Sequence, residues 1–77
     1  MATKKKEKLV RLEILSTKIA EEAEQVVFET GIKGFPFGIK AIEGGYHKVR
    51  TDLIPLSEAE EIKDKLEKEC YDVMILL

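Results

Sequence analysis

The sequence predicts an α+β fold in which one β-α-β unit occurs twice within a single small domain. Three observations carry this prediction. Residues 44–77 contain a glycine turn, an alternating strand, an amphipathic helix and a closing apolar run, in that order. Residues 9–42 contain an earlier copy of the same series. At 77 residues, the chain has room for one domain with a small hydrophobic core.

The first copy begins with a strand that leads into a helix. In residues 9–15, apolar and charged side chains alternate, as in a strand with one buried and one wet face. Ser16 or Thr17 is expected to cap the helix that follows. The apolar stripe of this helix consists of Ile19, Ala20, Ala23, Val26, Val27 and Thr30. Gly31 and Gly34 are expected to end the helix and turn the chain.

A second strand and a tight turn come next. Residues 35–42 form this strand, and Pro36 places it at an edge of the sheet, because proline cannot donate to a central ladder. Gly44 and Gly45 allow the positive φ angles that a two-residue hairpin requires. The turn therefore joins two neighbouring antiparallel strands.

The second copy has the clearer pattern. The strand at residues 47–53 alternates between a wet side and a buried side, the latter made of Val49, Thr51 and Leu53. Pro55 ends this strand, because it lacks an amide donor. Ser57 and Glu60 form a capping-box pattern at the start of a helix. The apolar stripe of that helix consists of Ala59, Ile62, Leu66 and Cys70. Residues 71–77 form the closing strand.

An internal repeat sets the order of these elements. A shift of 39 positions places Arg11 on Arg50 and residues 20–22 on residues 59–61. Two β-α-β units joined by a hairpin give the ferredoxin-like order β-α-β-β-α-β, a four-stranded antiparallel sheet. Right-handed crossovers put both helices on one face of that sheet. The other face is left open, and function is expected there.

Composition narrows the class of protein. The net charge of −2 gives no general attraction to nucleic acid or to an anionic membrane. Cys70 is the only cysteine, so no internal disulfide forms, and its helical spacing predicts a buried side chain. No apolar run has the length of a membrane span or of a signal-peptide core, which predicts synthesis in the cytoplasm. Residues 1–8 are expected to form a disordered basic tail, and residues 9–77 the domain.

The sequence offers no catalytic, metal or cofactor motif. His47 is the sole histidine and has no second ligand or acid-base partner at a suitable spacing. Gly31, Gly34 and Gly38 do not match a phosphate-binding loop. RNA-recognition domains of this layout stack bases on aromatic side chains. The matching outward positions here are not aromatic: Arg11, Glu13, Lys48, Arg50 and Asp52. We therefore expect neither an enzyme nor a nucleic-acid-binding protein.

The open sheet face carries the candidate site. Arg11 and Arg50 occupy equivalent places in the repeat, with Lys48 beside Arg50 and the carboxylates Glu13 and Asp52 close by. Mixed donors and acceptors of this kind suit a neutral, hydroxyl-rich ligand such as a glycan, or a protein partner. The alternative is that these residues form ordinary cross-strand ion pairs that keep an exposed sheet soluble.

The chain resembles the SPOR (sporulation-related repeat) family over residues 9–77. That family repeats a glycine, an aromatic residue, a short strand, a loop and a helix that opens with acidic residues and alanine. The corresponding segments here are 45–50, 58–60 and 71–73, which read GYHKVR, EAE and YDV. The first half, LVRLEILSTKIAEEAEQVV, corresponds to the family's first repeat.

The resemblance implies a non-catalytic module that binds peptidoglycan. SPOR domains hold glycan strands stripped of their peptide stems on the sheet face away from the helices, in proteins of cell division, sporulation and phage lysis. By position, the resemblance implies these ligand-binding residues: Arg11, Lys40, His47, Lys48 and Arg50. A chain made in the cytoplasm would act at the wall only after lysis or as part of a larger protein.

A second reading stays open. A small ferredoxin-like domain can also serve as a protein-interaction or regulatory module. In that case the chain would form a homodimer through its open sheet face or through an edge strand, with Pro36 and Gly38 limiting pairing at one edge. Neither reading requires a cofactor, a nucleic acid or insertion into a membrane.

Overall fold

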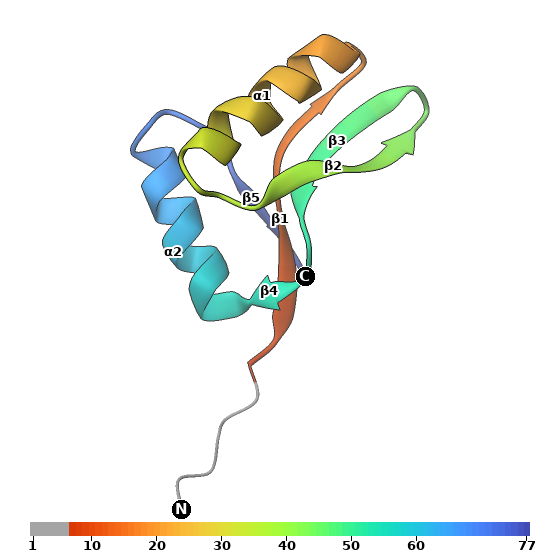
Figure 1. Cartoon of the computed structure of the whole chain (residues 1–77). Coiled ribbons are helices and arrows are strands. Elements are labelled where there is room, and N and C mark those ends of the chain that lie inside the picture. The colour runs from red at the N-terminus through yellow and green to blue at the C-terminus, as the bar shows by residue number, and fades with distance from the viewer. Residues whose placement is uncertain (1–6) are drawn as a thin grey trace, which may run out of the picture.

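The fold is α+β, with two helices and a curled antiparallel sheet in the order drawn in Figure 1. A computed structural model describes residues 7–77. The elements, in chain order, are β1 (Leu9–Thr17), α1 (Ala20–Ile32), β2 (Phe37–Glu43), β3 (Tyr46–Thr51), β4 (Ile54–Pro55), α2 (Leu56–Glu67) and β5 (Met74–Leu76). The first β-α-β unit and the final α-β pair are therefore present as predicted.

Strand β1 lies at the centre of the sheet. It pairs antiparallel with β3 on one side, and β2 follows β3 at the edge. On its other side, β1 pairs with the short β4 through Leu9 and Val10, and with β5 through Arg11 to Glu13. Figure 1 shows β1 running through the middle of the molecule, with the β2–β3 hairpin on one side and α2 on the other. The sequence did not predict β4, because Pro55 was expected to end pairing.

Two register shifts curl the sheet. One lies in β1 between Glu13 and Leu15, and the other lies in β2 between Ile39 and Ala41. An extra residue in one strand of an antiparallel pair bends that strand and increases its twist. The β2–β3 hairpin therefore bends relative to the first half of β1, which Figure 1 makes visible.

Both helices pack into one hydrophobic core. Ala23 of α1 and Ala59, Ile62 and Leu66 of α2 belong to the same buried cluster. The sheet contributes buried side chains from alternate strand positions: Val10, Leu12, Phe37 and Val49. Because both helices bury their stripes against the same strand face, the opposite face carries the charged residues of β1 and β3.

The glycine hairpin forms as predicted. β2 ends at Glu43 and β3 begins at Tyr46, so Gly44 and Gly45 are the two turn residues. Their φ angles are +56° and +84°, in the region that favours glycine. The prediction that β2 is an edge strand is confirmed by its place at the end of the sheet order, although Pro36 precedes the strand.

The expected start of the first helix was too early. Ser16 and Thr17 belong to β1, and Ile19 stands at the helix N-cap without a side-chain cap. Thr17 still bonds at this corner: its hydroxyl accepts from the Ile19 amide at 3.1 Å and donates to Glu22 at 2.8 Å. β1 therefore extends beyond the predicted strand end, because residues up to Thr17 pair with β3.

The capping box at the second helix is wrong. Pro55 is the N-cap of α2, and it makes no side-chain cap hydrogen bond. The helix starts at Leu56, so Ser57 lies inside its first turn and cannot act as the N-cap. The Ser57 amide instead donates to the Glu7 carboxylate at 3.0 Å, and the Leu56 amide donates to the Lys8 carbonyl at 3.0 Å. The predicted disordered tail otherwise falls on residues 1–6, outside the described residues.

Four residues expected to be buried are exposed: Ile19 and Ala20 at the start of the α1 stripe, and Leu53 and Cys70. Cys70 lies beyond the end of α2 with a φ angle of +71°, and its thiol is free and exposed. The chain reverses there toward β5, and a left-handed residue often follows a helix at such a reversal. Leu53 lies after the end of β3 and is also exposed, so its place in the strand alternation was wrong.

A hydrogen bond between α1 and the loop before β5 makes the stability of the fold depend on pH. The Tyr71 phenol donates to the Glu29 carboxylate at 2.9 Å, which raises the pKa of Tyr71 above its ordinary value. Hydrogen bonds from Gln25 and Tyr71 lower the pKa of Glu29. The raised pKa of Tyr71 means that this stabilisation is complete below the ordinary tyrosine pKa and is lost as pH rises through the raised value. The lowered pKa of Glu29 means that its stabilisation is lost as pH falls through the lowered value.

We therefore expect Tyr71→Phe to lower the melting temperature at neutral pH. Its melting temperature should also fall less steeply than that of the wild type above the ordinary tyrosine pKa, because no phenolate forms beside Glu29. Circular dichroism melts across this alkaline range measure both effects. Tyr46→Phe is the control, since Tyr46 lies on a different surface. Parallel curves for Tyr71→Phe and the wild type would show that the bond does not contribute.

Candidate functional site

Four of the five predicted ligand-binding residues lie on one sheet face. Arg11 and Glu13 alternate with the buried Val10 and Leu12 along β1, so they point away from the helices. Arg50 pairs directly with Glu13 across the β1–β3 ladder. Lys48 follows on the same side of β3, and Lys40 reaches over Gly38 from β2. We call this surface the open face and define it by Arg11, Glu13, Lys40, Glu43, Tyr46, Lys48, Arg50 and Asp52.

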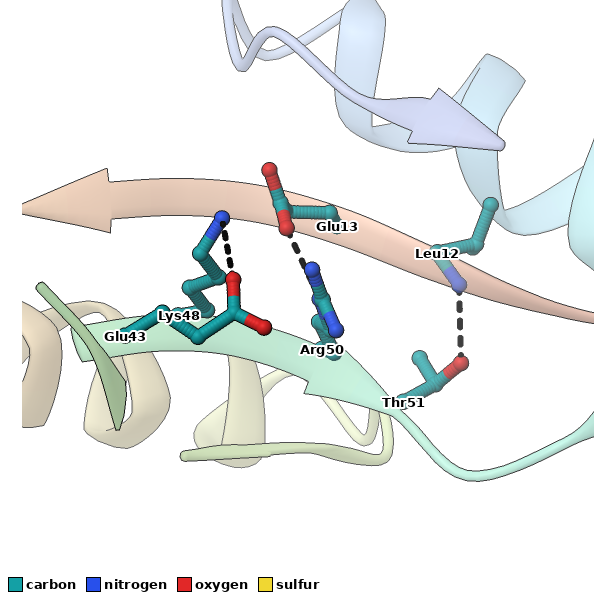
Figure 2. A network of polar contacts seen from close by, with 6 residues as sticks. All are labelled: Leu12, Glu13, Glu43, Lys48, Arg50 and Thr51. Carbon is teal, nitrogen blue, oxygen red and sulfur yellow. Dashed lines mark hydrogen bonds and ion pairs between the residues drawn. The ribbon is translucent and has the colours of Figure 1, made fainter. Parts of the chain in front are cut away.

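Three ion pairs cross the open face. Arg50 Nε lies 2.8 Å from Glu13 Oε1, and Lys48 Nζ lies 3.5 Å from Glu43 Oε1. Lys40 Nζ lies 2.8 Å from Asp52 Oδ1. Figure 2 shows the first two, with Arg50 and Lys48 extending from β3 beside their carboxylate partners. The sequence expectation that Glu13 and Asp52 lie among the basic residues is therefore confirmed.

The Arg50–Glu13 pair is the most enclosed of the three. The side chain of Glu13 is 13% exposed and that of Arg50 is 23% exposed. Direct cross-strand pairing and burial fix this pair more firmly than a surface ion pair. The bond uses Nε, so the two terminal amino groups of the guanidinium keep donors that can reach a ligand.

Two cations, Lys40 and Arg11, act on the carboxyl group of Asp52. The hydrogen bond from Lys40 lowers the pKa of the Asp52 carboxyl, and the charges of Lys40 and Arg11 act in the same direction. Arg11 is exposed opposite Leu76 of β5 and has no ion-pair partner among residues 7–77. Arg11 is therefore the freest cation of the predicted set.

His47 does not belong to this group. It pairs with Thr17 of β1 and Ile42 of β2, one position away from Lys48 along β3. Successive strand residues point to opposite faces, so His47 lies on the side of Val49, toward the helices. The resemblance had placed His47 with Lys48 and Arg50, and strand alternation separates it from them.

Tyr46 is a surface residue that the sequence reasoning missed. It shares the side of Lys48 and Arg50 on β3, is 41% exposed, and pairs with Glu43 at the hairpin. The Lys18 ammonium lies 5.2 Å from the centroid of its ring, within cation–π range. Continuing the alternation back from Lys48 by two residues could have placed Tyr46 here. No pattern in the sequence brings Lys18 over the ring.

The described part of the chain shows no metal cluster. Among residues 7–77, no three histidine, cysteine, aspartate or glutamate side chains lie together as metal ligands. Within the same residues, neither helix has the length and apolar character needed to cross a membrane. The open face is thus a polar surface with one aromatic ring, suited to binding through hydrogen bonds and stacking.

Comparison with known proteins adds no assignment. No family model matches the chain, and neither the curated proteins nor the solved structures give a significant match.

Proposed function

We propose that the chain is a non-catalytic, SPOR-like module that holds a neutral glycan strand, of the kind left when peptidoglycan loses its peptide stems, on its open face. The single observation that supports this most is the row of fixed donor–acceptor pairs beside an exposed tyrosine. Sugar hydroxyls both donate and accept, so a surface carrying cations and carboxylates in alternation can bond to neighbouring hydroxyls.

The balance of charge favours a neutral ligand. The open face has the cations Arg11, Lys40, Lys48 and Arg50 and the carboxylates Glu13, Glu43 and Asp52. Three of the cations are already paired with these carboxylates, which weakens attraction for a polyanion. The Tyr46 ring adds an apolar surface on which the C–H face of a sugar ring can pack.

The ferredoxin-like arrangement is part of the same proposal. β1 lies between β3 and β5 with antiparallel pairing, and both helices share one core, which supports this topology. We assign β4 as an additional short strand that pairs with the first two residues of β1, Leu9 and Val10.

A second candidate function has one observation in its favour. The edge strand β2 exposes Ile42 at 64%, together with the partly exposed Ile39. An exposed apolar edge strand can pair with the same strand of a second copy. Sedimentation of the protein over a range of concentrations separates this homodimer from a monomeric glycan-binding module.

Replacing Arg11 and Arg50 together by alanine is expected to reduce retention on stem-stripped peptidoglycan about tenfold or more, because each guanidinium bonds to sugar oxygens. A pull-down on purified wall, with and without amidase treatment, measures the change. Lys65→Ala with Lys68→Ala is the matched control, since it removes two exposed cations from α2 and its end.

Arg50→Ala leaves the enclosed Glu13 carboxylate without its partner and can destabilise the fold. A second variant therefore tests the same face without breaking an ion pair. Tyr46→Ala keeps all three ion pairs and is expected to weaken retention as well. If the folded double variant and Tyr46→Ala both bind stripped wall like the wild type, the open face is not the glycan site.

A further inference from the structure

The last part of β1 has a strand neighbour on one side only. β5 pairs with Arg11 to Glu13 and stops there, whereas β3 continues beside β1 as far as Thr17. Among the described residues, no strand pairs with Ile14 to Thr17 on the β5 side, where Leu15 is half-buried and Ser16 is exposed. A strand edge of this kind presents amide and carbonyl groups to any extended chain that lies beside it.

Two hollows line this free edge and meet at Leu15. The first, about 550 Å³, lies between β1, the segment before β5 and the outer flank of α2. The second, about 500 Å³, lies between Leu15 and the flank of α1 that carries Glu22 and Glu29. That flank faces the β5 side, because Glu29 bonds to Tyr71 in the loop that leads to β5. The two hollows share Leu15 as a lining residue and are together called the groove below.

The walls of the groove are acidic. Carboxylates supplied by α1 and by the segment before β5 line it, namely Glu21, Glu22, Glu29 and Asp72. None of these four forms an ion pair within residues 7–77. The cation Lys63 is already bonded to Glu67 at 2.6 Å. Leu15, Ile19 and Val26 supply the apolar floor.

We propose that this groove binds an extended basic peptide, which adds as a strand to the free edge of β1 in line with β5. The backbone of the peptide would bond to residues 14–17, its apolar side chains would pack on Leu15, and its cations would face Glu21 and Asp72. Main-chain bonds supply affinity in this mode of recognition, and alternate side chains supply specificity. The groove borders the open face at Glu13, which lines both, but peptide binding there does not depend on glycan binding.

The test uses fluorescence anisotropy with a labelled peptide of alternating lysine and valine. Two comparison peptides carry glutamate in place of lysine, or N-methyl groups on alternate amides that remove strand donors. The variant Glu21→Lys with Asp72→Lys reverses two exposed groove charges. Glu58→Lys is the control, since Glu58 is an exposed carboxylate on α2 outside the groove.

We expect saturable binding of the lysine peptide, weakened about tenfold by the double reversal and unchanged by Glu58→Lys. The other two peptides should fail to bind, and amide exchange should slow in residues 14–17 when the lysine peptide is present. The proposal is overturned if no peptide binds, if N-methylation has no effect, or if Glu58→Lys weakens binding equally. Protection of residues 14–17 that grows with protein concentration alone would also overturn it, because a second copy would then be the occupant.

Discussion

Leu66→Ala is expected to lower the free energy of unfolding by about 3 kcal/mol, the typical cost of removing a fully buried leucine side chain. Leu66 lies on α2 in the same cluster as Ala23 of α1 and Leu12 of β1. A domain of this size is expected to have a total stability of only about 4–11 kcal/mol. The substitution therefore removes a large share of the stability, and urea unfolding followed by circular dichroism measures it.

The same substitution at an exposed leucine is the matched control. Leu77 is the most exposed large apolar residue in the described chain, so Leu77→Ala should leave the unfolding midpoint unchanged. Equal effects of the two substitutions would show that α2 does not pack on the sheet as described. A loss at Leu66 alone supports one core shared by both helices.

Thr51→Val is expected to destabilise the fold by about 1–3 kcal/mol, because it removes a buried acceptor while nearly conserving volume. The Thr51 hydroxyl accepts from the Leu12 amide at 3.0 Å and donates to the Asp52 carbonyl at 2.8 Å. Figure 2 shows the first bond, which joins β3 to β1 beside the open face. In the valine variant, the Leu12 amide is buried without a partner.

Thr51→Ser separates the hydrogen bond from the packing. Serine keeps the hydroxyl, so this variant should preserve the slow exchange of the Leu12 amide and lose only the contribution of one methyl group. The exchange rate of that amide, measured by NMR in both variants, is the direct readout. An amide that stays equally protected in Thr51→Val would contradict the assigned role of the hydroxyl.

Short-range patterns predicted most of the elements. The alternation of β1 around Val10 and Leu12, the positive φ angles at Gly44 and Gly45, and the spacing of Ile62 with Leu66 each depend on a few adjacent residues. Such patterns follow from strand and helix periods alone. The errors occur where a contact between residues far apart in the sequence determines where an element begins or ends. The second helix lacks the predicted capping box because it begins at Leu56, beside the backbone of residues 7–8.

The candidate site was also predictable in part. Arg11, Lys48 and Arg50 were placed together by alternation and by the internal repeat, and the structure brings them to one face. His47 was grouped with them by resemblance, although the same alternation puts it on the opposite side. The free edge at residues 14–17 could not be predicted, because it depends on where β5 leaves β1.

The most direct test of the proposed function is an NMR titration of the isotope-labelled protein with glycan strands freed of their peptide stems. We predict that amide shifts change for Arg11, Tyr46, Lys48 and Arg50 on the open face, while those of α1 and α2 stay constant. No change at any concentration, or changes confined to the helices and the free edge of β1, would contradict the account.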